Sequence, residues 1–426
     1  MEGQQRILRE LADRFTEPVR DPVWRHIHLS PELLRLVDTA EFQQLSRIRQ
    51  LGPAYLVYPG ATHTRFSHSL GVAHIGRRLL LQLLSHPDAP ALSMEGVRAF
   101  LAAALLHDVG HFPYTHSFKT LPLAEHEELT GRIVQSGALA RRIREDLGVS
   151  PAIVAAIVDQ SLPHQGGPEV DLYRKILSGS LDPDKLDYLN RDAYFCGVPY
   201  GTQDLDFALG RIVPAGYTGI ALDSSGITAL ENILFSKYLM YRAVYWHRTV
   251  RVATAMIRKA IFLALQAEEL RPEDLYSLDD ELLLSRVGAI GESRFPPLTL
   301  LRRVGARELL KPVADIPFSS SNANHRKLEE STCREQLEEK IARELRHRGA
   351  PEKWEVILDL PDRISFEAEF PILERGELRD FSTVSVFSRD VVERFTTTLR
   401  RIRLILPEEA AESLADPERF LREIIS

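Results

Sequence analysis

Apolar residues recur at helical spacing across most of the chain from residue 30 to residue 270. Within this stretch, Val72, Ile75 and Leu79 fall on one face of a helix. Helix-start signals accompany the periodicity, as where Ser30-Pro31 places a capping hydroxyl directly before a proline in the first turn. The pattern predicts a mainly α-helical protein whose central part is a helical bundle.

One predicted helix is apolar on every side and ends in two polar residues. Its apolar run covers residues 99–106, and His107 and Asp108 follow directly. A helix that is apolar all round lies in the core of a protein. A buried imidazole beside a buried carboxylate needs a charged or hydrogen-bonding partner, or its pKa shifts. Because a bound metal ion satisfies both groups, this pair predicts a metal site.

Two further side chains are candidates to complete that site. His68 lies on the apolar, and therefore buried, face of its helix. Farther along, Asp182 stands at an N-cap position before Pro183, and Asp184 follows in the first turn. Together with the His-Asp pair, His68 and Asp184 offer two imidazoles and two carboxylates, which suit a divalent ion such as manganese, iron, zinc or magnesium. Spacing alone leaves the alternative that these are ordinary hydrogen-bonded residues.

The predicted helix around Asp184 has two faces. Tyr188 and Asp192 follow Asp184 at four-residue spacing and share its stripe. Asp187 and Arg191 have the same spacing on the opposite side. There we expect an ordinary solvated ion pair.

Strand-like patterns are confined to one internal segment and the C-terminal part. In residues 216–230, β-forming residues flank an Asp-Ser-Ser-Gly turn and predict a short hairpin. Farther on, the pattern predicts a linker or mobile loop at residues 316–324 and two alternating strands at 354–360 and 363–370. Two helices are predicted after them, near residues 387–404 and 415–425. We therefore expect a main domain over residues 1–310 and a small α+β region over residues 311–426, with subunit contacts as a candidate role of that region.

Composition and charge are those of an ordinary globular protein. The 426 residues are 44% hydrophobic and 27% charged, as is typical of folded domains. The net charge of −7 argues against a general nucleic-acid-binding surface. Basic clusters at residues 141–144 and 400–403 are expected to be solvated helix faces, with an anionic effector as the alternative.

Cysteine usage and hydropathy indicate a cytoplasmic protein. Cys196 and Cys333 cannot build a disulfide framework and fit no zinc spacing. The N-terminal residues lack the apolar stretch of a signal peptide, and no window approaches 18 uninterrupted apolar residues. We expect a reducing compartment and no membrane insertion.

The order of His68, the pair His107-Asp108 and Asp184 resembles the HD-domain metal phosphohydrolases, which carry a histidine, a later His-Asp pair and a later aspartate. The likeness is greatest to the branch that hydrolyses deoxynucleoside triphosphates (dNTPs), and it spans about residues 20–260. It is carried by residues 21–27, 37–52, 58–72, 106–116, 182–192 and 241–251. The resemblance implies an HD-domain helical bundle and one divalent ion held by these four residues, without distinguishing manganese, iron, zinc, magnesium, nickel or cobalt.

The resemblance also implies catalytic histidines. Hydrolysis at the α-phosphorus needs neutralised phosphate charge, a positioned water and a proton donor, and histidine suits the last task. The family's catalytic positions fall on His111, His126 and His116, with Glu127 orienting the ring of His126. Lys119 stands where relatives carry an acidic residue, three positions after His116, so His126 and His111 are the preferred donors. A helix-end residue that bonds a carbonyl is the structural alternative for His111.

A dNTP substrate is implied by further matched positions. A triphosphate needs several cations, and arginine and lysine bind phosphate in different ways. The matched residues are Arg65, Lys185 and Lys237 on the phosphates, Tyr188, Asp192, Tyr241 and Tyr245 on the sugar and base, and Gln50 and Leu51 under the sugar. Asp192 would accept a hydrogen bond from the 3′-hydroxyl, and a close fit under the sugar would select deoxyribose. Core packing is the alternative for the tyrosines.

A nucleotide effector and a homo-oligomer, either dimer or tetramer, are the remaining implications. Asp38 and Gln43 match an activator site of the SAM-containing members, but Ser46 replaces an arginine there, so activation by GTP in the same manner is not expected. The pair His247-Arg248 matches residues near a second activating nucleotide. His63 fits no motif and is expected to be an ordinary core or surface residue.

Two other functions stay open at this point. One is a different HD phosphohydrolase, such as a nucleotide phosphatase or phosphodiesterase. The other is a nucleotide-binding regulator without catalysis, which an intact set of metal ligands argues against.

Overall fold

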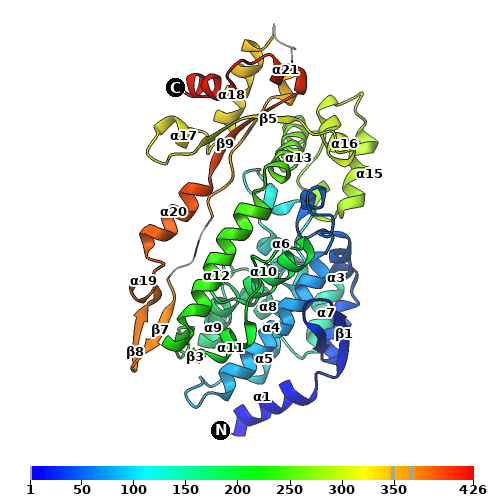
Figure 1. The fold of residues 1–426 in the computed structure, drawn as a ribbon. Coiled ribbons are helices and arrows are strands. Elements are labelled where there is room, and N and C mark those ends of the chain that lie inside the picture. Colours follow the sequence, from blue (N-terminus) through cyan, green and yellow to red (C-terminus); the bar gives the residue numbers. More distant parts are fainter. Residues whose placement is uncertain (1, 347–350, 365, 367–368) are drawn as a thin grey trace.

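Helices form most of the computed structural model, which describes residues 2–346, 351–364, 366 and 369–426 (Figure 1). The first helices are α1 (Glu2–Asp13), α2 (Pro31–Val37), α3 (Ala40–Gln44), α4 (Arg65–Ser85), α5 (Met94–Leu106), α6 (His126–Val134), α7 (Gly137–Glu145), α8 (Pro151–Val158), α9 (Gly167–Leu177), α10 (Pro183–Cys196), α11 (Leu205–Gly210), α12 (Ile227–Met240) and α13 (Arg248–Gln266). Later helices are α14 (Glu273–Tyr276), α15 (Asp280–Ile290), α16 (Thr299–Gly305), α17 (Ala323–Lys327), α18 (Ser331–Glu344), α19 (Phe381–Val384), α20 (Arg389–Leu399), α21 (Glu408–Glu412) and α22 (Pro417–Ile425). The prediction of a mainly α-helical fold is confirmed.

Nine short strands form three sheets. The strands are β1 (Glu17–Asp21), β2 (Arg25–Leu29), β3 (Ile212–Pro214), β4 (Ile220–Asp223), β5 (Lys311–Pro317), β6 (Ile357–Asp359), β7 (Pro371–Glu374), β8 (Glu377–Asp380) and β9 (Arg401–Leu406) among the described residues. Their order is β1-β2, β3-β4-β7-β8 and β5-β9-β6. All pairings are antiparallel except that of β4 with β7, which joins the C-terminal part to the helical core in parallel register.

The apolar helix α5 lies at the centre of the helical core. Residues 99–106 are each at most 3% exposed, as their all-round apolar pattern predicts. Helices α4, α8 and α9 pack against α5, and α4 also packs along α10 (Figure 1). The ends of α4, α5 and α10 that carry the predicted metal ligands are therefore held by the protein's main core.

Local signals set the helix starts at this core. Ser30 accepts a hydrogen bond from the Leu33 amide and caps α2. Asp182 accepts a hydrogen bond from the Lys185 amide at 2.6 Å, and Pro183 occupies the first turn of α10. These caps satisfy amides that have no partner within the helix. Both predicted starts are confirmed, and the second fixes where Asp184 enters the site.

A glycine allows α4 and α10 to approach closely. A Cβ atom at Gly71 would lie only 1.8 Å from Asp187 Oδ1 and 2.6 Å from Arg191 Nη2. No other residue type fits this contact without movement of α10. The buried polar side of α10 therefore lies directly against the first turns of α4.

The predicted hairpin exists, but its position was wrong. Its strands are β3 and β4, with Ile212 opposite Leu222. The Asp-Ser-Ser-Gly segment follows the hairpin instead of turning it, because Asp223 accepts a hydrogen bond from the Ser225 amide and caps a 3₁₀ turn that leads into α12. An Asx cap and a hairpin turn use the same residue types.

Three C-terminal predictions need correction. Residues 316–324 are not one linker, because β5 continues to Pro317 and α17 begins at Ala323. The helix predicted near 387–404 ends at Leu399, and the predicted basic helix face at 400–403 begins strand β9. Arg403 is only 5% exposed because β9 is the middle strand of its sheet, and Arg400, directly before β9, is 3% exposed against Phe318.

Other parts of this region agree with expectation. Strand β6 lies within the predicted 354–360, and α22 within 415–425. The strand predicted at 363–370 includes residues 365, 367 and 368, which lie outside the described residues. The arginines of the 141–144 cluster are exposed on α7, as predicted for a solvated helix face. None of the described helices has the length and apolar character needed to cross a bilayer.

Candidate metal centre

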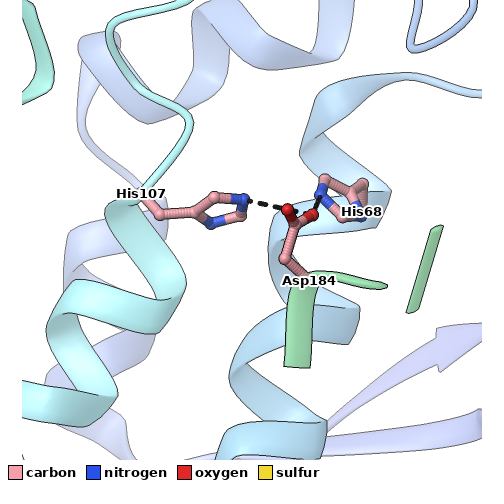
Figure 2. Close-up of side chains that lie close together, drawn as sticks. All are labelled: His68, His107 and Asp184. Carbon is pink, nitrogen blue, oxygen red and sulfur yellow. Dashed lines mark ion pairs between the residues drawn. The ribbon is translucent and has the colours of Figure 1, made fainter. Parts of the chain in front are cut away.

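Three predicted metal ligands from three separate helices meet in the structure. His68 comes from the first turn of α4, His107 directly follows α5, and Asp184 lies in the first turn of α10 (Figure 2). His68 Nε2 is 2.9 Å and His107 Nε2 is 3.9 Å from Asp184 Oδ1. Figure 2 shows both rings pointing toward this carboxylate. The ligand atoms of the three residues all lie within 4.8 Å of one another, which is a spacing that one ion can span.

Asp108, the fourth predicted ligand, borders the same place. Its Oδ1 lies 3.2 Å from His107 Nε2, and its Oδ2 lies 3.9 Å from His68 Nε2. Oδ2 also accepts a hydrogen bond of 2.7 Å from Arg65 Nη1. Arg65 is buried, and the resemblance places it on substrate phosphates. In this structure it is paired with a candidate metal ligand.

The outer nitrogens of both histidines are occupied, which leaves the inner ones for an ion. His68 Nδ1 lies 2.8 Å from Asp187 Oδ2, and His107 Nδ1 lies 3.0 Å from the Ala104 carbonyl oxygen. Such contacts fix the tautomer of a metal-binding histidine and the orientation of its ring. His107 Nε2 is buried without a hydrogen-bond partner among the described residues. An orphaned buried nitrogen beside two carboxylates fits a divalent cation.

Charge at the centre also favours a cation. Burial alone would lower the pKa of His68, but the Asp184 and Asp187 carboxylates raise this pKa to about 10. Burial would likewise raise the pKa of Asp184, yet the bond and charge of His68 bring this pKa below its usual value. The carboxylates therefore stabilise positive charge between them.

The expected solvated ion pair on α10 was wrong. Asp187 and Arg191 are both 0% exposed. Arg191 binds Asp187 through Nε and Nη2 at 2.8 and 2.9 Å, and binds Asp21 through Nη1 at 2.7 Å. Trp24 Nε1 donates a further hydrogen bond to Asp187. Asp21 and Trp24, at the end of β1 and in the turn after it, contact this face of α10. The pair therefore supports His68 instead of facing solvent.

Three further histidines gather beside Asp108. His111 Nε2 lies 3.2 Å from His116 Nε2, and the ring centroids of His111 and His126 are 3.9 Å apart. His126 Nδ1 lies 3.0 Å from Glu127 Oε2. Burial lowers the pKa of His126 to about 3 and that of His111 well below its usual value. The structure thus brings together all four residues for which the resemblance implies catalytic roles.

A second close approach builds this histidine group. A Cβ atom at Gly110 would lie 2.3 Å from the carbonyl oxygen of His126 and 2.4 Å from the Thr130 amide. Thr130 Oγ1 accepts from the Gly110 amide and donates to the His107 carbonyl, both at 2.9 Å. The start of α6 is therefore fixed against the loop that follows α5.

The predicted phosphate-binding lysines make protein contacts. Lys185 Nζ donates to the Gly179 carbonyl at 2.9 Å and to Asp182 Oδ2 at 2.6 Å. Lys237 Nζ lies 5.5 Å from the centre of the Phe366 ring. Their proposed contacts with phosphate remain predictions.

The predicted sugar-binding residues form one network. Tyr245 donates a hydrogen bond of 2.7 Å to Asp192 Oδ2, and its ring stands edge-on to those of Tyr188 and Tyr241. His63 Nε2 lies 2.8 Å from Asp192 Oδ1. The backbone N–H of Gln50 donates to the His63 carbonyl at 3.0 Å, and Leu51, half-buried, precedes a 3₁₀ turn.

His63 is a residue that sequence reasoning missed. It is buried against Asp192 and stacks on Phe195 at 4.6 Å, so it belongs to the predicted sugar side of the site. The available signal was its position two residues before Arg65, inside the matched run 58–72.

Comparison with protein families agrees with this architecture. Residues 65–189 match the model of the HD domain, and residues 212–419 match the model of the HD-associated region. The first stretch contains all four candidate metal ligands. The second begins at β3 and includes β4, which pairs with β7.

Several known proteins are similar to this chain. Protein YwfO of Bacillus subtilis, whose function is uncharacterised, is 35% identical over 59% of this chain and 56% of its own length. The deoxynucleoside triphosphate triphosphohydrolase SAMHD1 of Danio rerio is 30% identical over 60% of this chain and 47% of its own length. The chain thus spans about half the length of these curated relatives. A crystal structure of a hypothetical protein from Aquifex aeolicus has a TM-score of 0.70 and 26% identity, covering 93% of this chain and 99% of that one.

Proposed function

Because this chain belongs to the HD-domain phosphohydrolases and carries an HD-associated region, we propose that it hydrolyses dNTPs to a deoxynucleoside and inorganic triphosphate. The reaction would proceed by attack of water on the α-phosphorus with one divalent ion in the site. The observation that carries the proposal is the meeting of His68, His107 and Asp184, with Asp108 beside them. The named activity of the SAMHD1 relatives supports the choice of substrate.

The chain's own residues supply the other parts of this chemistry. A divalent ion bound here would neutralise phosphate charge and lower the pKa of a bound water. Arg65 would bind phosphate with a guanidinium that Asp108 already orients at 2.7 Å. His111, His116 and His126 lie beside Asp108 and are the proposed groups for transferring a proton at the leaving oxygen, with Glu127 orienting His126.

The sugar would be bound on the opposite side of the proposed site. Asp192 would accept the 3′-hydroxyl, flanked by Tyr188, Tyr241 and Tyr245, while Gln50 and Leu51 would exclude a 2′-hydroxyl. Lys185 and Lys237 would contact the outer phosphates. A homo-oligomer, which the family resemblance implies, belongs to the same proposal. So does a nucleotide effector, for which the pair His247-Arg248 is a matched position.

Product identification tests the substrate and the bond cleaved. Purified protein is incubated with each dNTP and Mn²⁺, and the phosphate species are separated by ion exchange. Inorganic triphosphate and deoxynucleoside in equal amounts are expected. Orthophosphate or pyrophosphate alone would identify another HD phosphohydrolase, and nucleotide binding without turnover in any metal would identify a non-catalytic regulator.

A metal-ligand variant tests the site itself. Asp184→Ala is expected to lose turnover by at least about 1,000-fold and to bind Mn²⁺ more weakly, because it removes the carboxylate shared by both rings. Asp206→Ala is the matched control, since Asp206 is 85% exposed and pairs only with Arg78 among the described residues. Circular dichroism checks that both variants fold. Full activity of Asp184→Ala would contradict the proposed centre.

A further inference from the structure

A small cavity lies between the helical core and the C-terminal sheet, where helices α13 and α18 both pack against strand β6. Water molecules can place their centres in about 30 Å³ of it, which is room for roughly two or three waters or one small ion. Three basic side chains line it, namely Arg258 and Lys259 of α13 and Arg334 of α18. Its lining contains none of the candidate metal ligands or proposed catalytic residues.

The three cations are buried, but they differ in counter-charge. Each is at most 8% exposed. Lys259 is neutralised, because its Nζ lies 2.5 Å from Glu338 Oε2. Arg258 has one ion pair, at 3.5 Å to Asp359, and no hydrogen bond among the described residues. That carboxylate already binds Arg251 through both of its oxygens, so Arg258 has only a share of its charge.

Arg334 makes no ion pair within the part of the chain that the structure describes. It donates to the Leu328 carbonyl at 2.8 Å and to Ser331 Oγ at 3.1 Å, which are both neutral acceptors. Burial and the charge of Arg258 lower the pKa of Arg334 to about 10, so this guanidinium is still charged at neutral pH. Two buried arginines that repel each other are costly to the fold unless an anion joins them.

The acidic residues that line the cavity are bound to other groups. Glu338 holds Lys259 and also accepts a hydrogen bond of 2.7 Å from the Leu358 amide. Glu335 is half-buried and lies 3.2 Å from Gln266 Nε2. Neither of these two carboxylates forms an ion pair with the buried arginines. The guanidinium groups therefore keep N–H donors that the described residues do not use.

We propose that the cavity binds one free inorganic phosphate ion between Arg258 and Arg334. A guanidinium fork matches the oxygens of a phosphate and binds them through paired hydrogen bonds. The cavity admits an ion of this size but not a nucleotide. Thr120 also lines it, and the Thr120 carbonyl accepts a hydrogen bond of 3.4 Å from Ser331 Oγ. The bound ion would therefore stabilise the contact between α18 and the loop that follows His116.

Hydrogen-exchange mass spectrometry of the wild type locates the bound ion. The metal-free protein is measured with saturating sodium phosphate and with sodium chloride at the same ionic strength. We expect phosphate to slow exchange in residues 118–121 and 331–344 by at least about 5-fold, because a ligand that binds only the closed state suppresses opening. Chloride should have no such effect. Protection confined to the surroundings of Arg65 would place the ion in the proposed substrate site and overturn the inference.

Phenyl phosphate separates a free ion from a phosphate group that a larger molecule carries. Its ring exceeds the cavity, so it should leave exchange in residues 118–121 and 331–344 unchanged. Equal protection by phenyl phosphate would overturn the assignment to a free ion.

Two substitutions test the arginines themselves. Arg258→Gln and Arg334→Gln should each raise the dissociation constant for phosphate at least about 10-fold, as loss of a hydrogen bond to a charged group does, in a titration that follows the thermal midpoint. Lys340→Gln is the matched control, because Lys340 is exposed on α18 outside the cavity lining and should keep the wild-type constant. Unchanged affinity in either arginine variant, or equal weakening in Lys340→Gln, would overturn the site. Absence of dNTP turnover with phosphate binding intact would contradict only the proposed function.

Discussion

Asp187 shows how one buried carboxylate supports a candidate ligand without joining the centre. It lies 2.8 Å from His68 Nδ1 and is held by Arg191 and Trp24. Burial would raise its pKa, but Arg191 and His68 lower that pKa to about 2, so the carboxylate stays charged. A charged acceptor strengthens the donor character of the opposite ring nitrogen toward a metal.

Asp187→Asn is therefore expected to weaken metal binding while leaving all ligands in place. We expect the dissociation constant for Mn²⁺ to rise about 10–100-fold, the usual effect of losing such an outer partner. Isothermal titration of Mn²⁺ measures the change, with Asp206→Asn as the exposed control. Unchanged affinity would show that His68 needs no orienting charge.

The contact of His63 with Asp192 leads to a prediction about substrate choice. With Tyr245, it occupies both oxygens of Asp192 and fixes the plane of that carboxylate. If Asp192 receives the 3′-hydroxyl, His63→Ala should lower kcat/KM for a dNTP about 10–100-fold, the worth of a hydrogen bond to a charged group. Turnover of the 2′,3′-dideoxy analogue should change little.

The comparison of the two substrates separates positioning from folding damage. His164→Ala is a suitable control, because His164 also pairs with an aspartate but contacts Asp171 instead of Asp192. An equal loss with the dNTP and the dideoxy analogue in His63→Ala would contradict the positioning role.

Among the elements, α4 and α10 depend on a glycine for their contact. Alanine normally stabilises a helix relative to glycine by about 0.5–1 kcal/mol. At Gly71, however, the added methyl group would overlap Asp187 and Arg191. Gly71→Ala is expected to lower the free energy of unfolding by about 1–3 kcal/mol, as overpacking of a core does.

The control for this prediction is another helical glycine. Gly288 in α15 has open space where a Cβ would lie, so Gly288→Ala should raise the free energy of unfolding by about 0.5–1 kcal/mol. Urea denaturation measures both variants. A stabilising Gly71→Ala would mean that the two helices are not in the contact described.

Local signals explain which elements could be predicted from the sequence. The cap at Asp182 and the apolar run of α5 depend on neighbouring residues alone, and both predictions agree with the structure. The burial of Asp187 and Arg191 depends on Asp21 and Trp24, more than 160 residues away in sequence. No pattern within α10 contains that information.

The prediction for the residues of strand β9 was wrong for a different reason. Residues 401–404 alternate Arg-Ile-Arg-Leu, which is a period of two and typical of a strand. The predicted helix near 387–404 included them, whereas α20 ends directly before them, at Leu399. Burial of Arg403 follows from its contacts with Asp315 and Asp359, which come from the two flanking strands.

For the whole molecule, a buried charge cluster joins the C-terminal sheet to the helical core. Asp359 on β6 is 0% exposed and binds Arg251 of α13 through both carboxylate oxygens. Arg258 of α13 and Arg403 of β9 lie 3.5 and 3.6 Å from the same carboxylate. Burial would raise the pKa of Asp359, but the three guanidinium groups lower it below its usual value. Asp359 thus faces three cations at this junction, of which Arg403 also pairs with Asp315.

Loss of the Asp359 charge should destabilise the junction between the C-terminal sheet and the helical core more than it destabilises the metal centre. Asp359→Asn leaves buried guanidinium groups without a full counter-charge, which typically costs about 3–5 kcal/mol. The sheet β5-β9-β6 should then exchange amide hydrogens faster, while α5 keeps its protection because its core does not include the cluster. Hydrogen-exchange mass spectrometry measures the protection of the sheet and of α5 separately.

Glu408→Gln, which removes an exposed pair with Lys311, is the control. It should change the opening free energy of the sheet and of α5 by no more than about 0.5 kcal/mol. Equal loss of protection in α5 and in the sheet would show instead that the HD core and the C-terminal region unfold as one unit.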